Sequence, residues 1–170
     1  WSRYSGIRTH RRGQVRAAFA DDDPALQGSN VEGLSVLGSV EHCLRAGLLA
    51  SGAIVAVGSN DARMAVADRL RGAGVQLISA VHPSATVMHG VRLGDGCLVA
   101  AGVVLVCGTF LEDDVIVNTG ATVDHDSHLS KGAQLASGVH TAGRVVIGEA
   151  VFVGVGASIG PSVTIGAGTI

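Results

Sequence analysis

The chain has 170 residues, of which 47% are apolar, 15% charged and 3% aromatic, and its formal net charge is −2. Because it has no basic excess to bind phosphates along a nucleic acid, the composition argues against nucleic-acid binding. No run reaches the roughly 18 consecutive apolar residues of a membrane-spanning helix, so no membrane partner is expected. The cysteines Cys43, Cys97 and Cys107 are irregularly spaced and predict reduced thiols of a cytoplasmic protein, neither a disulfide framework nor a zinc site.

The first eighty residues predict alternating strands and helices. Strands are expected at residues 14–20, 53–57 and 75–80, and helices at residues 40–49 and 61–73. This alternation predicts a small parallel α/β domain over residues 1–80. Ligands of such sheets bind beyond the carboxyl ends of the strands, which would place residues 21–23 and 58–61 on one rim. The alternative is that Asp and Gly stand at these positions only because they form good turns, and the sequence supports this explanation equally.

From Val81 onward the sequence repeats every six residues. Aliphatic residues recur at this interval from Val81 to Ile165, with Thr141 as the one exception. The fourth residue after each aliphatic residue is small or β-branched. The third residue after each aliphatic residue is Gly or Asp in eleven of the fifteen hexads. A period of six predicts a short strand and a turn, with Gly or Asp taking a positive φ in the turn. With three hexads in each triangular coil, residues 81–170 are expected to form a parallel β-helix of about five coils.

A nine-residue motif from Asn118 to Asp126 (Asn-Thr-Gly-Ala-Thr-Val-Asp-His-Asp) lies in the middle of this repeat. Together with residues 21–24, 33–38, 57–60 and 82–85, it resembles the hexapeptide-repeat acetyltransferases of bacterial surface sugars. These include sialic acid O-acetyltransferases and UDP-amino-sugar N-acetyltransferases, and the resemblance covers roughly residues 15–170.

The resemblance implies a Rossmann-like α/β domain, here without its first βα unit, followed by a left-handed parallel β-helix. It implies assembly as a homotrimer with acetyl-CoA as co-substrate and without a metal. The implied reaction is acetyl transfer to an amino or hydroxyl group of a sugar or nucleotide sugar. Transfer would be direct, in a ternary complex, because nothing in the sequence suggests an acyl-enzyme.

The resemblance assigns two catalytic residues, His125 as the general base and Asp126 as the carboxylate that raises its basicity. The chemistry agrees, because an amine or hydroxyl that attacks a thioester must lose a proton, and imidazole accepts protons near neutral pH. A carboxylate bonded to the other ring nitrogen would orient the imidazole and stabilise its cation. Both residues fall at the turn of a hexad, so His125 is expected to project outward. Spacing alone would favour a solvated surface histidine.

Binding residues are also assigned. The resemblance places the coenzyme near Gln134, Gly143 and Val155, while the rim residues Asp22, Asp23, Gly58 and Asp61 are the candidates for the acceptor sugar. The family often has His at the position of Gln134. Gln still forms hydrogen bonds there but carries no positive charge.

Two features depart from the family pattern. Residues 1–12 lack the Gly-rich turn that holds nucleotide phosphates in the family, so the first βα unit is expected to be missing or not to bind a nucleotide. The repeat also stops at Ile170, where the family adds further coils, so a truncated chain is expected.

Two other functions stay open. The missing turn and Gln134 also suit a non-catalytic or degenerate trimeric hexapeptide-repeat protein. A zinc-dependent carbonic anhydrase of the same fold would use three His. His89 and His125 lie two coils apart, but Ser130 occupies the place of the third ligand, which argues against zinc.

Overall fold

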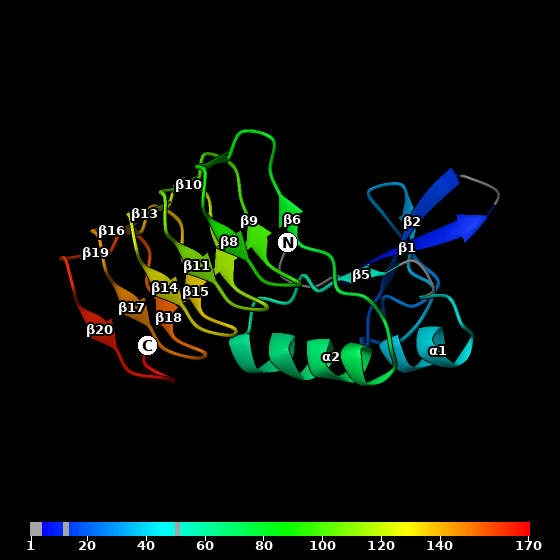
Figure 1. Cartoon of the computed structure of the whole chain (residues 1–170). Coiled ribbons are helices and arrows are strands. Elements are labelled where there is room, and N and C mark those ends of the chain that lie inside the picture. Colours follow the sequence, from blue (N-terminus) through cyan, green and yellow to red (C-terminus); the bar gives the residue numbers. More distant parts are fainter. Residues whose placement is uncertain (1–4, 12–13, 50–51) are drawn as a thin grey trace. The chain divides into compact units, whose positions relative to one another are not determined.

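The computed structural model describes residues 5–11, 14–49 and 52–170 (Figure 1). The chain divides into two compact units, Trp1–Ile78 and Ser79–Ile170. Within the described ranges, no helix is long and apolar enough to cross a membrane.

The first unit contains a three-stranded sheet in the order β2-β1-β5. Its central strand β1 (Ser5–Arg11) forms an antiparallel hairpin with β2 (Gln14–Ala20) and pairs antiparallel with β5 (Ala53–Ile54) on its other side. The sequence predicted β2 and β5 but missed β1, and the expected all-parallel sheet is wrong at this strand. Only Arg12 and Gly13, which lie outside the described residues, separate β1 from β2. A connection this short joins antiparallel neighbours.

Two helices and a small hairpin complete this unit. Helix α1 (Val40–Arg45) is shorter than predicted, whereas α2 (Asn60–Gly72) agrees with the prediction within one residue. Each begins after a serine, Ser39 or Ser59, whose hydroxyl accepts a hydrogen bond from a backbone N–H of the first turn. The hairpin joins β3 (Asn30–Val31) to β4 (Leu34–Ser35). The strand predicted at residues 75–80 is reduced to a parallel bridge between Ala53 and Leu77 and to the start of β6.

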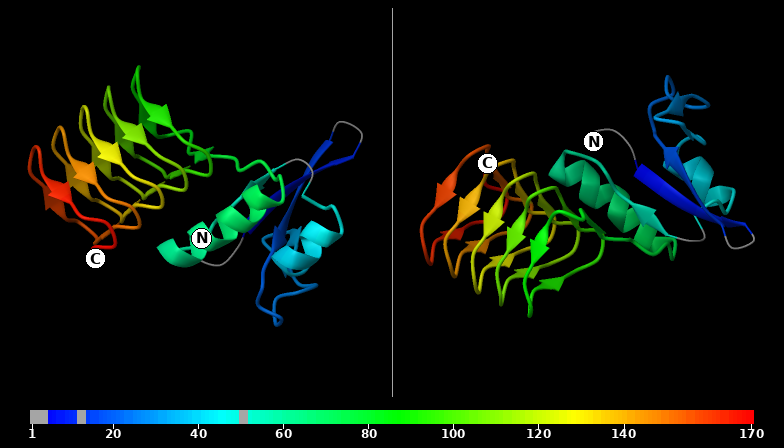
Figure 2. Two further views of the ribbon diagram at one scale, coloured as in Figure 1. Left: turned by 60° about the horizontal axis from the view of Figure 1, so that its bottom comes forward. Right: turned by 90° about the horizontal axis from the view of Figure 1, so that it is seen from above.

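The second unit is a parallel β-helix of two-residue strands at six-residue intervals (Figure 2). The β6 side consists of β6 (Ala80–Val81), β9 (Leu98–Val99), β12 (Ile116–Val117), β15 (Gln134–Leu135) and β18 (Phe152–Val153). The β7 side consists of β7 (Thr86–Val87), β10 (Val104–Leu105), β13 (Thr122–Val123), β16 (His140–Thr141) and β19 (Ser158–Ile159). The β8 side consists of β8 (Arg92–Leu93), β11 (Phe110–Leu111), β14 (His128–Leu129), β17 (Val146–Ile147) and β20 (Thr164–Ile165).

Register in the β-helix follows a step of 18 residues, or three hexads. Val117, for example, pairs with Val99 in the coil before it and with Leu135 in the coil after it. Each residue therefore stacks on the residues 18 positions away in the chain. This geometry decides which side chains meet at the functional site.

Residues of the β-helix are buried, or adopt a positive φ, at the hexad positions where the sequence predicted it. The inward aliphatic residues of the central coils, such as Leu111 and Leu129, are fully buried, and the exceptional Thr141 is buried as well. The predicted positive φ occurs at every sixth residue from Gly90 to Gly168, including five positions that are not Gly. The predicted left-handed parallel β-helix is thus confirmed.

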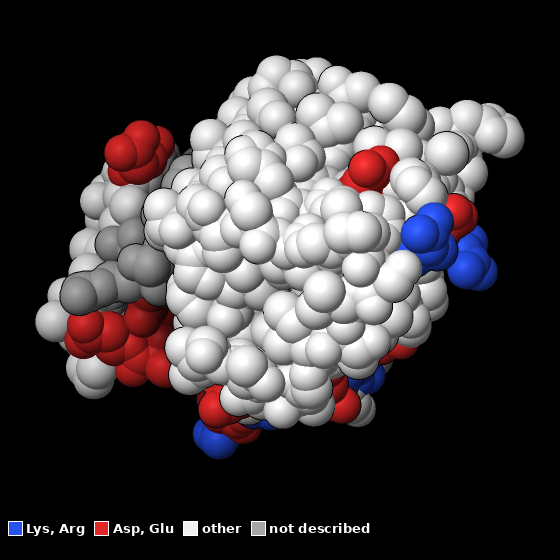
Figure 3. Space-filling model, turned by 90° about the vertical axis from the view of Figure 1, so that its left-hand side faces the viewer, with Lys and Arg blue, Asp and Glu red and all other residues white. Residues whose placement is uncertain are grey.

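Charged side chains gather in the earlier coils of the β-helix. Residues 150–170 carry no Asp, Glu, Lys or Arg, and Figure 3 shows the largely uncharged face on which β19 and β20 lie. Titratable groups that could move a proton are therefore concentrated in the middle coils, around His125.

Candidate functional site

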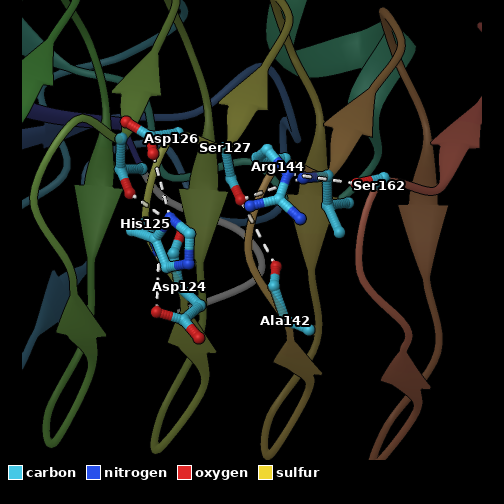
Figure 4. Close-up of polar contacts among 9 residues, drawn as sticks. Asp124, His125, Asp126, Ser127, Ala142, Arg144 and Ser162 are labelled. Carbon is cyan, nitrogen blue, oxygen red and sulfur yellow. Dashed lines mark hydrogen bonds and ion pairs between the residues drawn. The ribbon is translucent and has the colours of Figure 1, made fainter.

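His125 and Asp126 lie in the turn between β13 and β14 (Figure 4). The backbone of this turn is held from three directions. The N–H of His125 donates to Oδ1 of Asp124 at 2.8 Å, and the N–H of Asp126 donates to the carbonyl of Cys107 in the preceding coil at 3.1 Å. The carbonyl of His125 accepts the N–H of Arg144 in the next coil at 2.9 Å. The turn is thereby fixed between its two neighbouring coils.

The side chains of His125 and Asp126 form a hydrogen-bonded pair. Nδ1 of His125 lies 2.9 Å from Oδ2 of Asp126, and Figure 4 shows the two groups turned toward one another. An ionised carboxylate only accepts hydrogen bonds, so Nδ1 carries the proton and Nε2 presents its lone pair. The side chain of His125 is 41% exposed and that of Asp126 is 65% exposed, so a small molecule can reach the pair. This arrangement can take up a proton and stabilise the resulting cation.

Two buried hydroxyls brace the corner behind this pair. Oγ of Ser127 accepts the N–H of Val145 at 3.2 Å and lies 3.5 Å from the carbonyl of Ala142, to which it donates. Oγ1 of Thr109 donates to the carbonyl of Asp124 at 3.3 Å. Because these buried polar groups are paired, the corner keeps one arrangement rather than several.

The structure brings one of the three predicted coenzyme residues against His125. Gly143 lies in the turn between β16 and β17, which is the same corner of the triangular coil, one coil further along. Gln134 instead belongs to β15 on the β6 side, between Ile116 and Phe152. Val155 lies in the turn between β18 and β19, at a different corner, and is 79% exposed.

The predicted acceptor residues of the first unit divide into two groups. Oδ1 of Asp22 accepts the N–H of Val40 at 2.9 Å, and its Oδ2 lies 3.5 Å from Arg69 in the last turn of α2. Gly58 and Asp61 flank the opposite end of the same helix. The eight steps along the helix from position 61 to position 69 span about 12 Å, so these residues do not meet on one rim as expected.

Asp23 uses its carboxylate within its own turn. Its Oδ1 accepts the N–H of Ala25 at 2.9 Å, which is the turn-forming role that the sequence left open for this residue.

Sequence reasoning missed three residues that surround His125, namely Asp124, Cys107 and Arg144. The signal that could have found the last two is the 18-residue step, because Cys107 stands 18 residues before His125 and Arg144 stands 18 residues after Asp126. Cys107 is exposed, and the Nε of Arg144 donates to Oγ of Ser162 at 3.2 Å. Both residues belong to the turns that border the pair.

A second polar cluster lies on the β8 side. Nε2 of His128 is 2.8 Å from Oε1 of Glu112, and the His128 ring stacks on Phe110 with ring centroids 5.1 Å apart. The guanidinium of Arg92 lies 4.5 Å from the centroid of the Phe110 ring. His128 thus has both its ring face and its Nε2 engaged, unlike His125, and it is a structural residue of this side.

The described residues contain no group of three or more His, Cys, Asp or Glu that could hold a metal ion. His89 and His125 share a turn position, but Cys107 stands between them in the intervening coil. The described part of the site therefore offers a proton acceptor rather than a set of metal ligands.

The chain is similar to several known proteins. The family model described as the hexapeptide repeat of succinyl-transferase matches residues 84–107. A histidine-to-asparagine mutant of perosamine N-acetyltransferase from Caulobacter crescentus, in complex with CoA and GDP-perosamine, is 40% identical, with 91% of this chain and 73% of that chain covered and a TM-score of 0.83. PerB from Caulobacter crescentus, in complex with the same two ligands, is 42% identical and has a TM-score of 0.81. The match covers 89% of this chain and 71% of PerB.

The acetyltransferase domain of PglB from Neisseria gonorrhoeae is 36% identical, with 89% of this chain and 76% of that chain covered and a TM-score of 0.75. Among curated protein sequences, no match was found. The repeat, the left-handed β-helix and these similarities agree, and the chain belongs to the hexapeptide-repeat sugar acetyltransferases.

Proposed function

We propose that the protein transfers the acetyl group of acetyl-CoA to an amino group of a nucleotide-linked sugar, with His125 as the general base. The observation that carries this proposal is the hydrogen bond of 2.9 Å between Nδ1 of His125 and Asp126, which leaves Nε2 as the ring nitrogen that can accept a proton in a partly exposed side chain. Perosamine N-acetyltransferase and PerB, the two similar proteins from Caulobacter crescentus, are in complex with CoA and GDP-perosamine, and the name of the first supports an amine acceptor.

The reaction is a direct transfer. The acceptor nitrogen attacks the carbonyl carbon of the acetyl thioester, so that a C–N bond forms and the C–S bond to the coenzyme breaks. The proton lost by the nitrogen passes to Nε2 of His125, and the carboxylate of Asp126 stabilises the imidazolium. The coenzyme sulfur leaves as a thiolate and takes up this proton, which gives the acetamido sugar and free CoA.

The thiols of the chain do not support a covalent intermediate. Cys43 and Cys97 are buried, and burial raises the pKa of Cys97 to about 11, so it stays a poor nucleophile near neutral pH. Cys107 is exposed, and within the described residues its sulfur makes no hydrogen bond to a base. A thiol needs a base to activate it, so attack by the acceptor itself is the simpler route.

The coenzyme residues support a site built from more than one copy of the chain. His125 and Gly143 lie at the corner between the β7 and β8 sides, whereas Val155 lies at the corner between the β6 and β7 sides. The sequence resemblance implies that the coenzyme lies in the groove between neighbouring β-helices, where it can touch one corner of each chain. We therefore expect a homotrimer, with the coenzyme in the groove between neighbouring β-helices near Gln134, Gly143 and Val155.

The first unit is expected to hold the acceptor sugar. Gly58 and Asp61 stand on either side of Ser59, the N-cap of α2, so a bound sugar would lie near the N-terminal end of this helix. Asp23 keeps its second carboxylate oxygen for a sugar hydroxyl, whereas a sugar at Asp22 would have to share the oxygens that contact Val40 and Arg69. The three reduced thiols fit a reducing compartment such as the cytoplasm.

The proposal is tested by mass-spectrometric detection of CoA and acetylated product from acetyl-CoA and a panel of acceptors. GDP- and UDP-linked amino sugars are compared with sialic acids, which offer hydroxyl groups. His125→Ala should lower kcat by about 10²–10⁴-fold. His89→Ala is the matched control, because His89 occupies the same turn position two coils earlier, and it should leave kcat unchanged.

The outcomes separate the possible functions. Turnover with amino sugars that depends on His125 supports the proposal, and turnover with sialic acid alone would change the acceptor to a hydroxyl. Coenzyme binding without transfer to any acceptor would instead support a degenerate relative. Activity that depends on both His89 and added zinc would support the metal-dependent alternative.

A further inference from the structure

The imidazole of His125 lies directly on the backbone of Gly143, one coil further along. A Cβ atom built on Gly143 would contact Nε2 of the ring and would lie only 2.6 Å from Cε1 and 2.9 Å from Cδ2. Real Cβ atoms essentially never come so close to a neighbour, so either the ring or the substituted backbone would have to move. Gly143 is buried, although it lies in a turn at the surface of the coil.

The backbone itself does not require Gly at this position. Gly143 is not among the residues with positive φ, so an alanine would be unstrained in its conformation. The same turn position carries side chains in the other coils, namely those of His89, Cys107, His125 and Pro161. The fold therefore accepts side chains in this column, and the feature that distinguishes residue 143 is its place against the His125 ring.

A second glycine lies on the other side of the pair. A Cβ on Gly108 would contact Oδ1 of Asp126 and would lie 3.3 Å from its Cγ. Gly108 has a φ of +75°, so its turn favours Gly whatever stands beside it. The pair thus lies between two glycines. Backbone conformation explains the glycine at residue 108 but not the glycine at residue 143.

We infer that Gly143 is a positioning residue for His125, an inference that rests on the proposed role of this histidine as the general base. The missing side chain lets the ring lie flat on the coil while Nδ1 keeps its bond to Asp126. Nε2 is the ring atom closest to the vacant Cβ position, so a methyl group at residue 143 would push the ring away and turn the in-plane lone pair of Nε2 from its present direction.

The expected consequence of Gly143→Ala is a loss in kcat with an intact fold. A shift of about 1 Å in a catalytic group can cost about 10²-fold in rate, and the KM for acetyl-CoA should stay within about threefold because the coenzyme contacts are backbone groups. The melting temperature should fall only slightly, since alanine suits the φ of this residue and the partly exposed His125 ring can move aside. Gly160→Ala is the matched control: it is also a β-helix Gly outside the positive-φ set, and nothing lies within 4 Å of its Cβ position.

A double-mutant cycle separates positioning from an independent role in coenzyme binding. If Gly143 acts through His125, then Gly143→Ala should cost nothing further in a His125→Ala background. If the two losses multiply, Gly143 acts independently of the histidine and the inference is overturned.

A measurement that does not depend on activity tests the role of Gly143 separately from the proposed function. Long-range ¹H–¹⁵N NMR of the histidine rings, assigned with His125→Ala, should show His125 with its proton on Nδ1. Gly143→Ala should shift these signals, whereas Gly160→Ala should not. Unchanged His125 signals in Gly143→Ala would refute the inference even in an active enzyme. A clear shift in a protein that acetylates no acceptor would uphold the contact and refute the proposed function.

Discussion

Nδ1 of His125 and Oδ2 of Asp126 lie 2.9 Å apart, and Asp126 adopts a left-handed backbone conformation with a φ of 55°. The same turn position is occupied by Gly90 and Gly108 in the two preceding coils, where this conformation carries no steric cost. Asp is one of the few residues with a side chain that adopt this conformation readily. The turn can therefore hold a carboxylate beside the imidazole at little steric cost.

Replacement of Asp126 by Asn should separate activity from folding. Asn tolerates the left-handed conformation, so the melting temperature should change little. Its amide would offer Nδ1 a donor instead of an acceptor, which favours the wrong tautomer of His125, and kcat should fall by about 10²–10⁴-fold. Steady-state kinetics and a thermal melt check the two effects. Asp126→Gly is the companion variant and should be equally impaired but more stable, by up to about 1 kcal/mol. A kcat within threefold of the unaltered protein in Asp126→Asn would show that the carboxylate plays no such role.

Alkylation should report on the space beside His125. Cys107 is exposed and precedes His125 by one coil, whereas Cys43 and Cys97 are buried. N-ethylmaleimide near pH 7.5 should therefore add once per folded chain, at Cys107, and the adduct should block transfer by its bulk. Acetyl-CoA should slow both the labelling and the loss of activity. Cys107→Ala should stay active and resist the reagent. If the singly labelled protein keeps its activity, the reacting groups do not meet at this corner.

Stability should decline in alkaline solution because of Cys97. Burial, reinforced by Asp114 and Asp113, raises the pKa of this thiol from an ordinary 9.0 to about 11. Below pH 9 the thiol is neutral in both states, and between pH 9 and 11 only the unfolded chain ionises, so the free energy of unfolding falls over this range. The loss should reach at most about 2–3 kcal/mol. Urea unfolding from pH 8 to pH 11 measures it.

The matched variant for this prediction is Cys97→Ala, which should flatten the alkaline decline. Part of the slope should remain, because burial and then Asp22 also raise the pKa of Cys43, with the same sign. An identical slope in both proteins would assign the decline to other groups.

Mixed assemblies should reveal whether one site draws on two chains. His125→Ala removes the base, and Val155→Glu places a charge at an exposed position of the proposed coenzyme groove. Each variant alone should be inactive. If every site combines His125 of one copy with Val155 of the next, random equal mixing should restore about one quarter of the sites. Co-expression followed by an activity assay and light scattering measures this, with three times the 17.1 kDa chain mass expected for the assembly. No recovery in mixed trimers would show that both residues serve the site from the same chain.

The repeat was predictable from the sequence because its causes are local. A strand of two residues, an inward aliphatic side chain and a turn with positive φ all fit within one hexad, so the period of six records them directly. The turn position of His125 followed from the same count, and its role followed from the resemblance of the motif. In the first unit, β2 and α2 were predicted for the same reason, since their patterns lie within single short segments.

Features that depend on contacts between residues far apart in the chain could not be predicted from the sequence. The antiparallel place of β1 arises from its pairing with β2 and β5, and strand pairing leaves no periodic mark on so short a segment. Asp22 and Asp61 lie apart because Asp22 contacts Arg69 in the last turn of α2, whereas Asp61 lies in its first turn.

At the functional corner, the order of the hexads can be read from the sequence, and with it the step of 18 residues that stacks Gly143 against His125. The sequence did not determine the direction of the imidazole. That direction depends on one side-chain rotamer, which is chosen by the bond from Nδ1 to Asp126 and by the room above a residue without a Cβ atom. Packing between neighbouring coils selects this rotamer, and such packing exists only once the coils have formed.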